Sequence, residues 1–350
     1  MKIFTLVCRN VSLRQGGFIC LYMDKTALYP MGFGPILKQM IWGGNRILSY
    51  KGLVLNMSNI GESWELSGVP GNESVVSNGE FAGRTITELI KEYGPELLGR
   101  HVYETYGEKF PLLIKFIDAR DDLSIQVHPD DAMAQAVHGQ PFGKTEMWYV
   151  VSADKDAHLM SGLSAEITPE EYVSRVENNT ITDILCDYKV ASGDVFFLPA
   201  GRAHSIGKGC FIAAIQQTSD LTYRIYDFGR LGLDGNPREL HTELAKDAID
   251  YSVSEDYRTA YTPVLNEDAP LVECEYFKTN LLDLTEPLSV DVKSKDSFMI
   301  VICLEGLGKL KDSEGNVVAL KQGETVLVPA VTDEITFIPQ SQLKVLTSWI

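Results

Sequence analysis

The sequence predicts a mainly β protein with helical insertions, organised as two related β-barrels. Short strand-like runs punctuated by Gly, Pro and Asp recur along the chain, and runs of this length at close spacing are typical of a β-sandwich or barrel. The stretch GDVFFLPA at 193–200 returns as GETVLVPA at 323–330, with glycine, an acid, four mainly apolar residues, proline and alanine in the same order. We interpret this echo as two related barrels, the second of which ends the chain. A chance match of eight residues is the alternative.

The strand pattern is clearest in apolar runs that are too short for a membrane span and are bounded by turn residues. The predicted strands cover residues 63–69, 110–119, 146–153, 195–201, 210–217, 298–306 and 324–330.

Helical patterns appear as inserts between the strands. The predicted helical segments cover residues 85–99, 168–179 and 237–250. The first is broken by the Gly-Pro pair at 94–95. The second begins with Thr168 as its N-cap, Pro169 at the first helical position and Glu171 completing a capping box. The third opens with Pro237.

The composition excludes several classes of partner. The chain has 350 residues, of which 45% are hydrophobic and 23% charged, as in ordinary globular proteins. Its net charge of −17 argues against nucleic acid or an anionic membrane as a partner. No apolar run reaches the roughly 18 residues of a membrane helix. We therefore expect a protein of the cytoplasm that acts on a small molecule.

The cysteines agree with a reducing compartment. They lie far apart, without a CxxC pair or a regular spacing, and are expected to be free thiols. They are Cys8, Cys20, Cys186, Cys210, Cys274 and Cys303.

A candidate metal site begins in the stretch LSIQVHPD. Strand alternation places Ser124, Gln126 and His128 on one face, opposite Leu, Ile and Val. The following strand in GKTEMWYV supplies Glu146. In GDVFFLPAGRAHSIG, glycine and proline turns around one strand deliver His204. This last pattern resembles the second conserved motif of the cupins, jelly-roll (double-stranded β-helix) barrels that bind a metal inside the barrel through histidines.

Two imidazoles, one carboxylate and one amide make a plausible ligand set for Zn²⁺, and Mn²⁺, Co²⁺ or Fe²⁺ could also occupy it. The echo breaks at this point. His204 lies eleven residues after Gly193, whereas the residue eleven positions after Gly323 is Glu334. No histidine follows His241 in the sequence. We therefore predict one metal ion per chain, in the first barrel, and a structural second barrel that covers apolar surface of the first.

Several segments together carry a wider resemblance. LSIQVHPDD, GKTEMWYV, PAGRAHSIG and LTYRIYDFGR occur in this order, with IWGG near Ile41 and GESWELSG near Gly61. In these motifs and their spacing the chain resembles the type I mannose-6-phosphate isomerases, specifically the short bacterial form. The matching segments are spread from about Met23 to the C-terminus, and only residues 1–22 lack a counterpart.

The resemblance implies a zinc-dependent aldose–ketose isomerase that interconverts D-mannose 6-phosphate and D-fructose 6-phosphate through a cis-enediol(ate). The metal ligands that it implies are Gln126, His128, Glu146 and His204. The catalytic residues that it implies are Arg224 and Lys144, and the expected phosphate contacts are Ser124 and Lys115. Cations at these places suit the chemistry, because the negative charge that develops on the enediolate must be stabilised.

The same resemblance suggests a division into domains. We expect residues 23–262 to form a catalytic cupin domain with helical insertions and residues 263–350 to form a degenerate cupin-like β domain. Residues 1–22 lack the features of a secretory signal, and Met23 opens MDKTALYP like an ordinary start. We expect them to be an N-terminal extension outside the fold.

Some alternatives remain open from the sequence. The proton-transfer base could be Lys144, a metal-bound hydroxide, Asp227 or a histidine. Arg224 could instead be a structural ion-pair residue, because Asp220 and Asp227 are near in sequence. A non-catalytic sugar-phosphate-binding or regulatory cupin is the second functional class, although the presence of Arg224 and Lys144 argues against it. A cupin dioxygenase would more often carry a histidine where Gln126 stands.

The other histidines are expected to be structural. Each lies in a turn or on a helix, away from the motifs above. They are His101, His138, His158 and His241.

Overall fold

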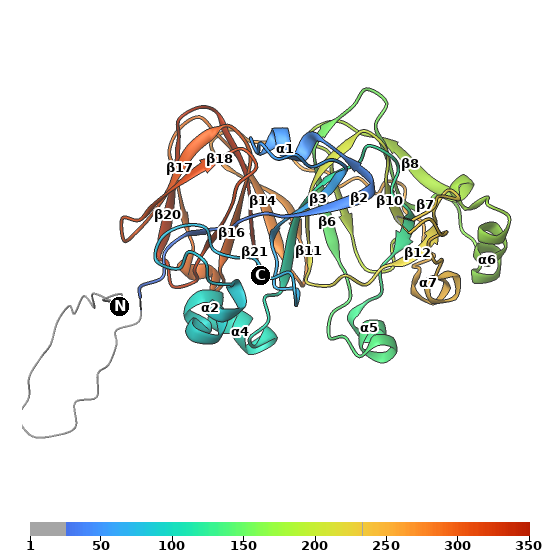
Figure 1. The fold of residues 1–350 in the computed structure, drawn as a ribbon, viewed down its shortest axis with the longest axis horizontal. Helices are drawn as coiled ribbons and strands as arrows, with labels where there is room; N and C mark the ends of the chain where they lie inside the picture. The colour runs from blue at the N-terminus through green and yellow to red at the C-terminus, as the bar shows by residue number, and fades with distance from the viewer. Residues whose placement is uncertain (1–25, 233) are drawn as a thin grey trace, which may run out of the picture.

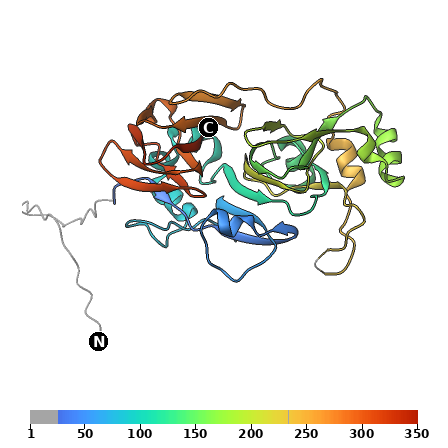
Figure 2. The same cartoon turned by 90° about the horizontal axis from the view of Figure 1, so that it is seen from above.

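The structure, a computed structural model, describes residues 26–232 and 234–350, and the predicted extension 1–22 lies outside the described residues. Within the described part, antiparallel sheets pair face to face into two β-sandwiches that lie side by side (Figures 1 and 2). No helix in this part is long and apolar enough to cross a membrane.

The first sandwich consists of sheets 1 and 2. Sheet 1 has the order β2 (Ile36–Gly44), β3 (Ile60–Leu66), β4 (Leu112–Asp118), β11 (Cys210–Gln217), β6 (Glu146–Ala153) and β9 (Val195–Leu198). Sheet 2 has the order β12 (Tyr223–Tyr226), β5 (Ile125–Val127), β10 (His204–Ile206), β7 (His158–Leu163) and β8 (Leu185–Lys189).

The second sandwich consists of sheets 3 and 4. Sheet 3 has the order β1 (Met31–Gly32), β19 (Thr325–Val328), β16 (Met299–Glu305), β21 (Leu343–Trp349), β14 (Lys278–Leu284) and β13 (Asp268–Glu273). Sheet 4 has the order β15 (Leu288–Asp291), β20 (Glu334–Pro339), β17 (Leu307–Asp312) and β18 (Val317–Lys321).

The helices lie outside the sheets. The α-helices are α1 (Arg46–Tyr50), α2 (Ile86–Tyr93), α3 (Pro95–Leu98), α4 (Arg100–Tyr106), α5 (Asp131–His138), α6 (Pro169–Glu177) and α7 (Thr242–Ala248). The 3₁₀ helices are η1 (Ile181–Ile184) and η2 (Lys293–Lys295). Helices α6 and α7 cover the outer face of sheet 2 at one end of the molecule (Figure 1).

The two sandwiches share one topology. The run β4-β11-β6-β9 in sheet 1 has the order of β14-β21-β16-β19 in sheet 3, and β5-β10-β7-β8 in sheet 2 has the order of β15-β20-β17-β18 in sheet 4. The echoed stretches form the corresponding strands β9 and β19. The echo therefore reflects a repeated structure and is not a chance match. Strand β1, from the start of the described chain, pairs with β19 in the second sandwich.

A comparison of the corresponding strands β6 and β16 shows how the interiors of the two sandwiches differ. Glu146 opens β6 and pairs with Leu198, while Met299 opens β16 and pairs with Val328 at the corresponding place. Met299 packs in a closed apolar core between sheets 3 and 4. Among the described residues, the second sandwich holds no cluster of histidine, cysteine and acidic side chains fit for a metal.

Most predicted elements are present, with two corrections. The break at Gly94 separates α2 from α3, and Thr168 caps α6 by accepting the N–H of Glu171. The capping box at α6 is wrong in its second half, because the Glu171 carboxylate binds the guanidinium of Arg175 at 2.8 Å instead. The helix expected from Pro237 begins only at Thr242.

The late start of α7 has a tertiary cause. The Arg238 side chain donates to the Asp227 carboxylate, with 2.7 Å between Nε and Oδ2. The backbone N–H of His241 donates to the Arg224 carbonyl at 2.8 Å. These contacts hold the segment before Thr242 outside the helix.

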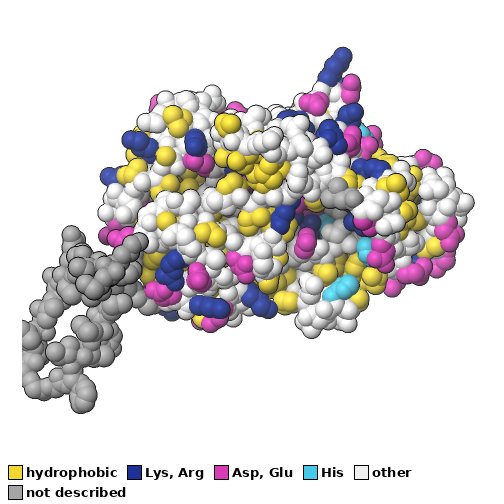
Figure 3. Space-filling model, viewed as in Figure 1, with side chains coloured by type: hydrophobic (Ala, Val, Ile, Leu, Met, Phe, Trp, Pro, Cys, Tyr) yellow, Lys and Arg dark blue, Asp and Glu magenta, His cyan; other side chains and the backbone are white. Residues whose placement is uncertain are grey.

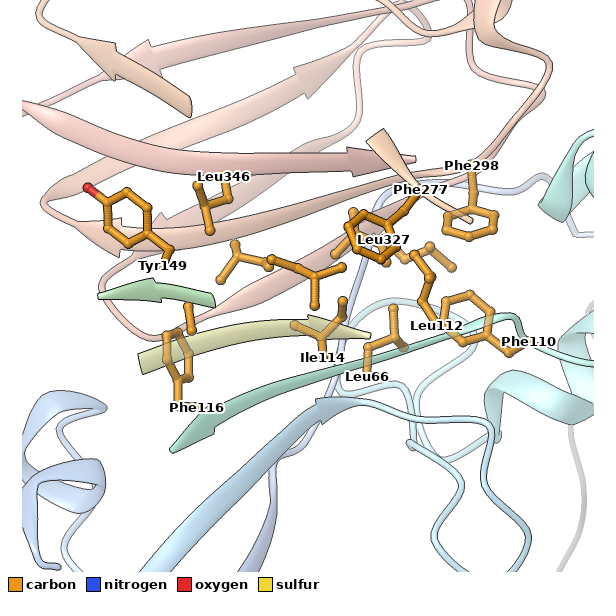
Figure 4. Packing of buried hydrophobic residues seen from close by; sticks show 14 of the residues in the cluster. Leu66, Phe110, Leu112, Ile114, Phe116, Tyr149, Phe277, Phe298, Leu327 and Leu346 are labelled. Carbon is orange, nitrogen blue, oxygen red and sulfur yellow. The ribbon is translucent and has the colours of Figure 1, made fainter. Parts of the chain in front are cut away.

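The central strands of sheet 1, β4, β11 and β6, are buried on both faces, which accounts for their nearly continuous apolar runs. Leu112, Ile114 and Phe116 of β4 face the second sandwich and pack in one cluster with residues of sheet 3 such as Leu327 and Leu346 (Figure 4). The alternate residues of β4 face the interior of the first sandwich. The second sandwich thus covers apolar surface of the first, as the sequence predicts.

Replacing Phe298 with alanine is expected to lower the free energy of unfolding by about 3–5 kcal/mol. Phe298 is fully buried in the cluster between the sandwiches, where its ring lies 5.1 Å from that of Phe110. Truncation removes apolar contacts and leaves a cavity at this junction. Urea unfolding followed by circular dichroism measures the loss. Val331→Ala is the control, because Val331 is 56% exposed and should change stability little; a similar loss in both variants would contradict the prediction.

His158 at the start of β7 links neighbouring segments by charge. Its Nε2 lies 3.6 Å from Asp122 Oδ1 and its Nδ1 lies 2.7 Å from Asp187 Oδ1 on β8. Asp122 and Asp187 together raise the pKa of His158 to about 9, against the opposing effect of burial. The protonated ring therefore ties β7 to β8 and to the segment before β5.

This pair of contacts predicts a pH-dependent stability. In the unfolded chain His158 has a pKa of about 6.5, so the stabilisation is complete below that pH and is lost as the pH rises through about 9. His158→Asn should therefore lower the thermal midpoint at pH 6 and have a much smaller effect above pH 9. Thermal unfolding of both proteins across this range measures the difference, and a gap that stays constant with pH would rule out this role.

Acidic side chains are scattered over the surface and gather at the end of the molecule that carries α6 (Figure 3). Glu166, Glu170 and Glu177 are exposed there. These acidic side chains therefore lie in contact with solvent, on the outside of the first sandwich.

Candidate metal and active site

The site is built on a row of residues across sheet 2. Arg224 on β12 lies opposite Gln126 on β5, Gln126 lies opposite His204 on β10, and His204 lies opposite Ser161 on β7. Residues directly opposite in antiparallel strands project to the same face. Their neighbours Ile125 and Val127 pack on the outer face against the helices, so the row faces the interior of the first sandwich.

Three side chains converge in that interior. His128 follows β5, His204 opens β10, and Glu146 reaches across from sheet 1. Glu146 Oε1 lies 3.3 Å from His128 Nε2 and 3.2 Å from His204 Nε2. All three residues are at most 2% exposed. They form a group whose ligand atoms lie within 4.8 Å of one another.

The tautomers of both histidines are fixed by the backbone. His128 Nδ1 lies 2.9 Å from the Leu221 carbonyl oxygen, and His204 Nδ1 lies 2.8 Å from that of Arg202. A carbonyl can only accept, so each Nδ1 carries a proton and donates it, and each ring turns its Nε2 toward Glu146. Metal-ligating histidines are commonly oriented in this way.

These residues fit a divalent cation. His128 Nε2 and Glu146 Oε1 are buried and have no hydrogen-bond partner among the described residues. Lone pairs that face one another at 3.2–3.3 Å repel unless a cation or a proton lies between them. Two ligand atoms on a tetrahedral Zn²⁺, each at about 2.0–2.1 Å, are themselves about 3.3 Å apart. The two distances between Glu146 and the imidazoles therefore suit such an ion.

Gln126 lies beside the same group. Its side-chain Nε2 is 3.3 Å from His204 Nε2. An N–H donated to this nitrogen requires that His204 Nε2 carry a lone pair, in agreement with the tautomer above. A half-turn of the amide would direct Oε1 to the same place, where it could serve as a fourth ligand.

The turn before His204 depends on glycine. Gly201 has a φ of +89°, in the left-handed region that favours glycine. Its N–H donates to the His128 carbonyl at 2.9 Å, and its carbonyl accepts from the N–H of Asp250 at 2.8 Å. The PAG turn presents His204, as the motif predicts, and its hydrogen bond to the His128 carbonyl also ties it to the segment that carries His128.

Lys144 supplies a cation next to the group. It is 6% exposed, and its Nζ lies 3.5 Å from Glu146 Oε2. Burial lowers the pKa of Lys144, and Glu146 only partly offsets this effect. Burial alone would raise the pKa of Glu146, but the charge of Lys144, the largest opposing cause, helps to lower it well below its ordinary value. Glu146 is therefore a carboxylate at neutral pH.

The pKa of His128 is lowered as well. Burial is the largest cause and the charge of Lys144 the next, and together they bring the pKa to about 3. His128 is thus neutral at physiological pH, which is the form that binds a metal.

A second charged pair lies on the same wall of sheet 1. Lys115 Nζ is 3.5 Å from Glu62 Oε2 and 4.8 Å above the Trp64 ring. Burial would raise the pKa of Glu62, but Lys115, Trp64 and Lys144 lower it. The sequence identified Lys115 but not Glu62. The signal was ambiguous, because polar residues occur on both faces of the strand in GESWELSG.

Arg224 is not held by a carboxylate. Among the described residues no acidic side chain lies within ion-pair distance of it, whereas Asp227 is bound by Arg230 at 2.6 Å and by Arg238. The guanidinium donates from Nη1 to the Glu239 carbonyl at 2.9 Å, and its Nε is buried without a partner among the described residues. The alternative that Arg224 is paired with Asp220 or Asp227 is therefore wrong.

Two further polar atoms border His204 and were not identified from the sequence as part of the site. Trp148 on β6 meets the His204 ring edge-on, with 5.2 Å between centroids. Trp148 Nε1 and Ser161 Oγ are both buried and have no hydrogen-bond partner among the described residues. A tryptophan and a serine in apolar strands carry no sequence signal of this kind. Ser124 is 5% exposed and lies two residues before Gln126; its contact with phosphate stays a prediction.

Comparisons with known proteins agree on one family. Residues 33–156 match the model for the phosphomannose isomerase type I catalytic domain, and residues 267–347 match the model for the mannose-6-phosphate isomerase cupin domain.

Similar whole proteins are found in two bacteria. The chain is 34% identical to mannose-6-phosphate isomerase ManA of Bacillus subtilis over 86% of this chain and 93% of that protein. It is 35% identical to mannose-6-phosphate isomerase of Streptococcus mutans, over 84% and 90% of the two chains. The crystal structure of mannose 6-phosphate isomerase from Bacillus subtilis superposes with a TM-score of 0.83 at 31% identity, over 92% of this chain and 100% of that one.

Proposed function

This chain belongs to the type I mannose-6-phosphate isomerases, and from that premise we propose that it interconverts mannose 6-phosphate and fructose 6-phosphate inside the first sandwich, around His128, Glu146 and His204. It is an enzyme of the aldose–ketose isomerase class. The location is supported by the convergence of two imidazoles on one carboxylate, where His128 Nε2 and Glu146 Oε1 are buried and have no hydrogen-bond partner among the described residues.

We propose that a single Zn²⁺ is held by His128, Glu146 and His204, with Gln126 as the fourth ligand. Once bound, the ion would act as a Lewis acid on the sugar oxygens. The row of sheet 2 that carries Gln126 and His204 also carries Arg224. Its unpartnered Nε, directed into the interior, supports a role in stabilising the negative charge of the cis-enediol(ate).

The structure narrows the choice of proton carrier. Asp227 is already bound by two arginines, so it is a poor base. Both ligating histidines donate Nδ1–H to carbonyls and direct Nε2 at Glu146, so neither is free. Burial lowers the pKa of Lys144 and makes its neutral amine easier to form. We therefore favour Lys144 Nζ for moving the proton between C2 and C1.

Binding of the phosphate is proposed for Ser124 and Lys115. Lys115 is buried on the interior wall of sheet 1, and Ser124 is buried beside the metal ligands on sheet 2. Phosphate held away from the reacting carbons can orient the sugar and so contribute binding energy to catalysis.

The finer description of the fold is also a proposal. We propose that both sandwiches are cupin-like barrels, the first (23–262) catalytic and metal-binding and the second (263–350) degenerate. The shared strand order and the replacement of Glu146 by Met299 support this view. The four described cysteines are free, in keeping with a protein of the cytoplasm.

The deciding experiment is a coupled assay with mannose 6-phosphate, in which fructose 6-phosphate is consumed by downstream enzymes that report its formation. We expect turnover by the isolated protein in the presence of Zn²⁺. Binding of mannose 6-phosphate without turnover would favour the non-catalytic sugar-phosphate-binding protein instead.

A further inference from the structure

The segment Glu239–His241 runs along the free edge of β12. This strand is the outermost one of sheet 2, so only one of its sides pairs with another strand. At Arg224 the other side is covered by a single residue. The N–H of Arg224 donates to His241 Nδ1 at 3.0 Å, and the carbonyl of Arg224 accepts from the N–H of His241 at 2.8 Å.

The ring of His241 must be neutral to make this contact. Nδ1 can accept the Arg224 N–H only when its proton is absent, so the remaining proton is on Nε2. The charged and titratable groups that face the ring are Arg224 and Tyr223 on β12, His138 on α5 and Glu239 on its own segment. Burial, opposed by Glu239 but aided by Arg224 and His138, lowers the pKa of His241. The accepting form is therefore the stable one at neutral pH.

The same segment also holds the side chain of Arg224. Nη1 donates to the Glu239 carbonyl at 2.9 Å, while the buried Nε has no partner among the described residues. Backbone and guanidinium are thus fixed by residues only two apart, and Nε is left for a ligand in the interior.

The segment is itself anchored at both ends. On one side, Arg238 binds both oxygens of the Asp227 carboxylate. On the other, the carbonyl of His241 accepts the N–H of Ala245 in the first turn of α7 at 2.8 Å. The His241 ring makes no capping bond to α7, so its contact with Arg224 is not needed to start that helix.

We infer that His241 is a positioning residue for the isomerisation, because it fixes Arg224 at the edge of sheet 2 so that the guanidinium points at the substrate. The inference rests on the proposed catalytic role of Arg224. It goes further by assigning a function to a histidine that lies outside the metal ligands and outside the motifs that identify the site.

The test compares His241→Ala, which removes the acceptor, with His241→Asn, whose Oδ1 can take the place of Nδ1. We expect His241→Ala to lower kcat/KM for mannose 6-phosphate about tenfold to a hundredfold, since misplacement of a catalytic group by about 1 Å costs on this scale. His241→Asn should remain close to the wild type. His101→Asn, at an exposed position on α4, is the control for the exchange of a histidine as such.

Two readouts separate positioning from a general structural effect. The backbone amide of Arg224 should exchange with deuterium faster in His241→Ala than in the wild type or in His241→Asn. In an Arg224→Ala background, loss of His241 should bring no further decrease of the residual kcat/KM, because residues that act as a unit are not additive.

Each other outcome has a distinct meaning. If Arg224→Ala retains near-normal turnover, the proposed role of Arg224 fails and the inference fails with it. If Arg224→Ala is impaired but His241→Ala is not, the inference alone fails. Independent, multiplicative effects of the two substitutions would also overturn it, and so would an equal loss in His241→Asn, which keeps the acceptor.

Discussion

Replacing Arg224 with alanine is expected to lower kcat/KM for mannose 6-phosphate by at least about 10²–10³-fold, the usual cost of losing one donor that stabilises transition-state charge. Its Nε is buried without a partner among the described residues, and no carboxylate there lies within ion-pair distance. The guanidinium of Arg224 thus has no carboxylate partner among the described residues before the substrate binds. Initial rates in the coupled assay measure the loss.

The fold and the metal content should survive this substitution. The outer-face neighbours Tyr223 and Ile225 keep their packing, and Arg224 contacts none of the metal ligands by a hydrogen bond or an ion pair among the described residues. Arg100→Ala, at an exposed position on α4, is the matched control. Near-normal turnover by Arg224→Ala would show that the arginine is structural.

Removing the metal is expected to abolish isomerisation altogether. Dialysis against a chelator should leave a folded, inactive protein, and addition of Zn²⁺ should restore activity. His204→Ala should have the same effect without recovery, because it removes one of two imidazoles that meet at Glu146 Oε1. The cost should be greater than for any surface histidine, since no other described residues form a comparable group.

Elemental analysis of the metal-loaded protein should give one ion per chain. In the second sandwich the place of Glu146 is taken by Met299, inside an apolar core. His204→Ala should then lower the content toward zero. Two tightly bound ions per chain, or one ion per chain still bound in His204→Ala, would contradict the assignment of a single metal site to this group.

The convergence of His128, Glu146 and His204 could be predicted because its sequence signals are local. Strand alternation in LSIQVHPD places Gln126 and His128 together, and the glycine at 201 with φ of +89° makes the turn that presents His204. The break in the repeat, from His204 to Glu334, likewise follows from counting along the chain, and the structure places both residues at the first positions of corresponding strands.

Other features could not be predicted because they depend on contacts between distant segments. The pairing of Lys115 with Glu62 follows from the register of β3 on β4, which strand periodicity does not contain. The helix expected from Pro237 starts later because Asp227 and Arg224 bind the residues ahead of it. The same contacts hold His241 beside Arg224. The late start of α7 and the inferred positioning role of His241 therefore have one cause.

Sheet 1 packs against sheet 2 on one face and against the second sandwich on the other, and this double contact restricts the substitutions that the chain can accept. Lys115 faces the interior of the first sandwich, while its immediate neighbours Ile114 and Phe116 face the second sandwich. A substitution that alters the packing between the two sandwiches therefore acts on the same strand that carries Lys115. Substitutions in the second sandwich are therefore constrained by the position of Lys115, because sheet 1 is both the packing surface for that sandwich and a wall of the interior of the first.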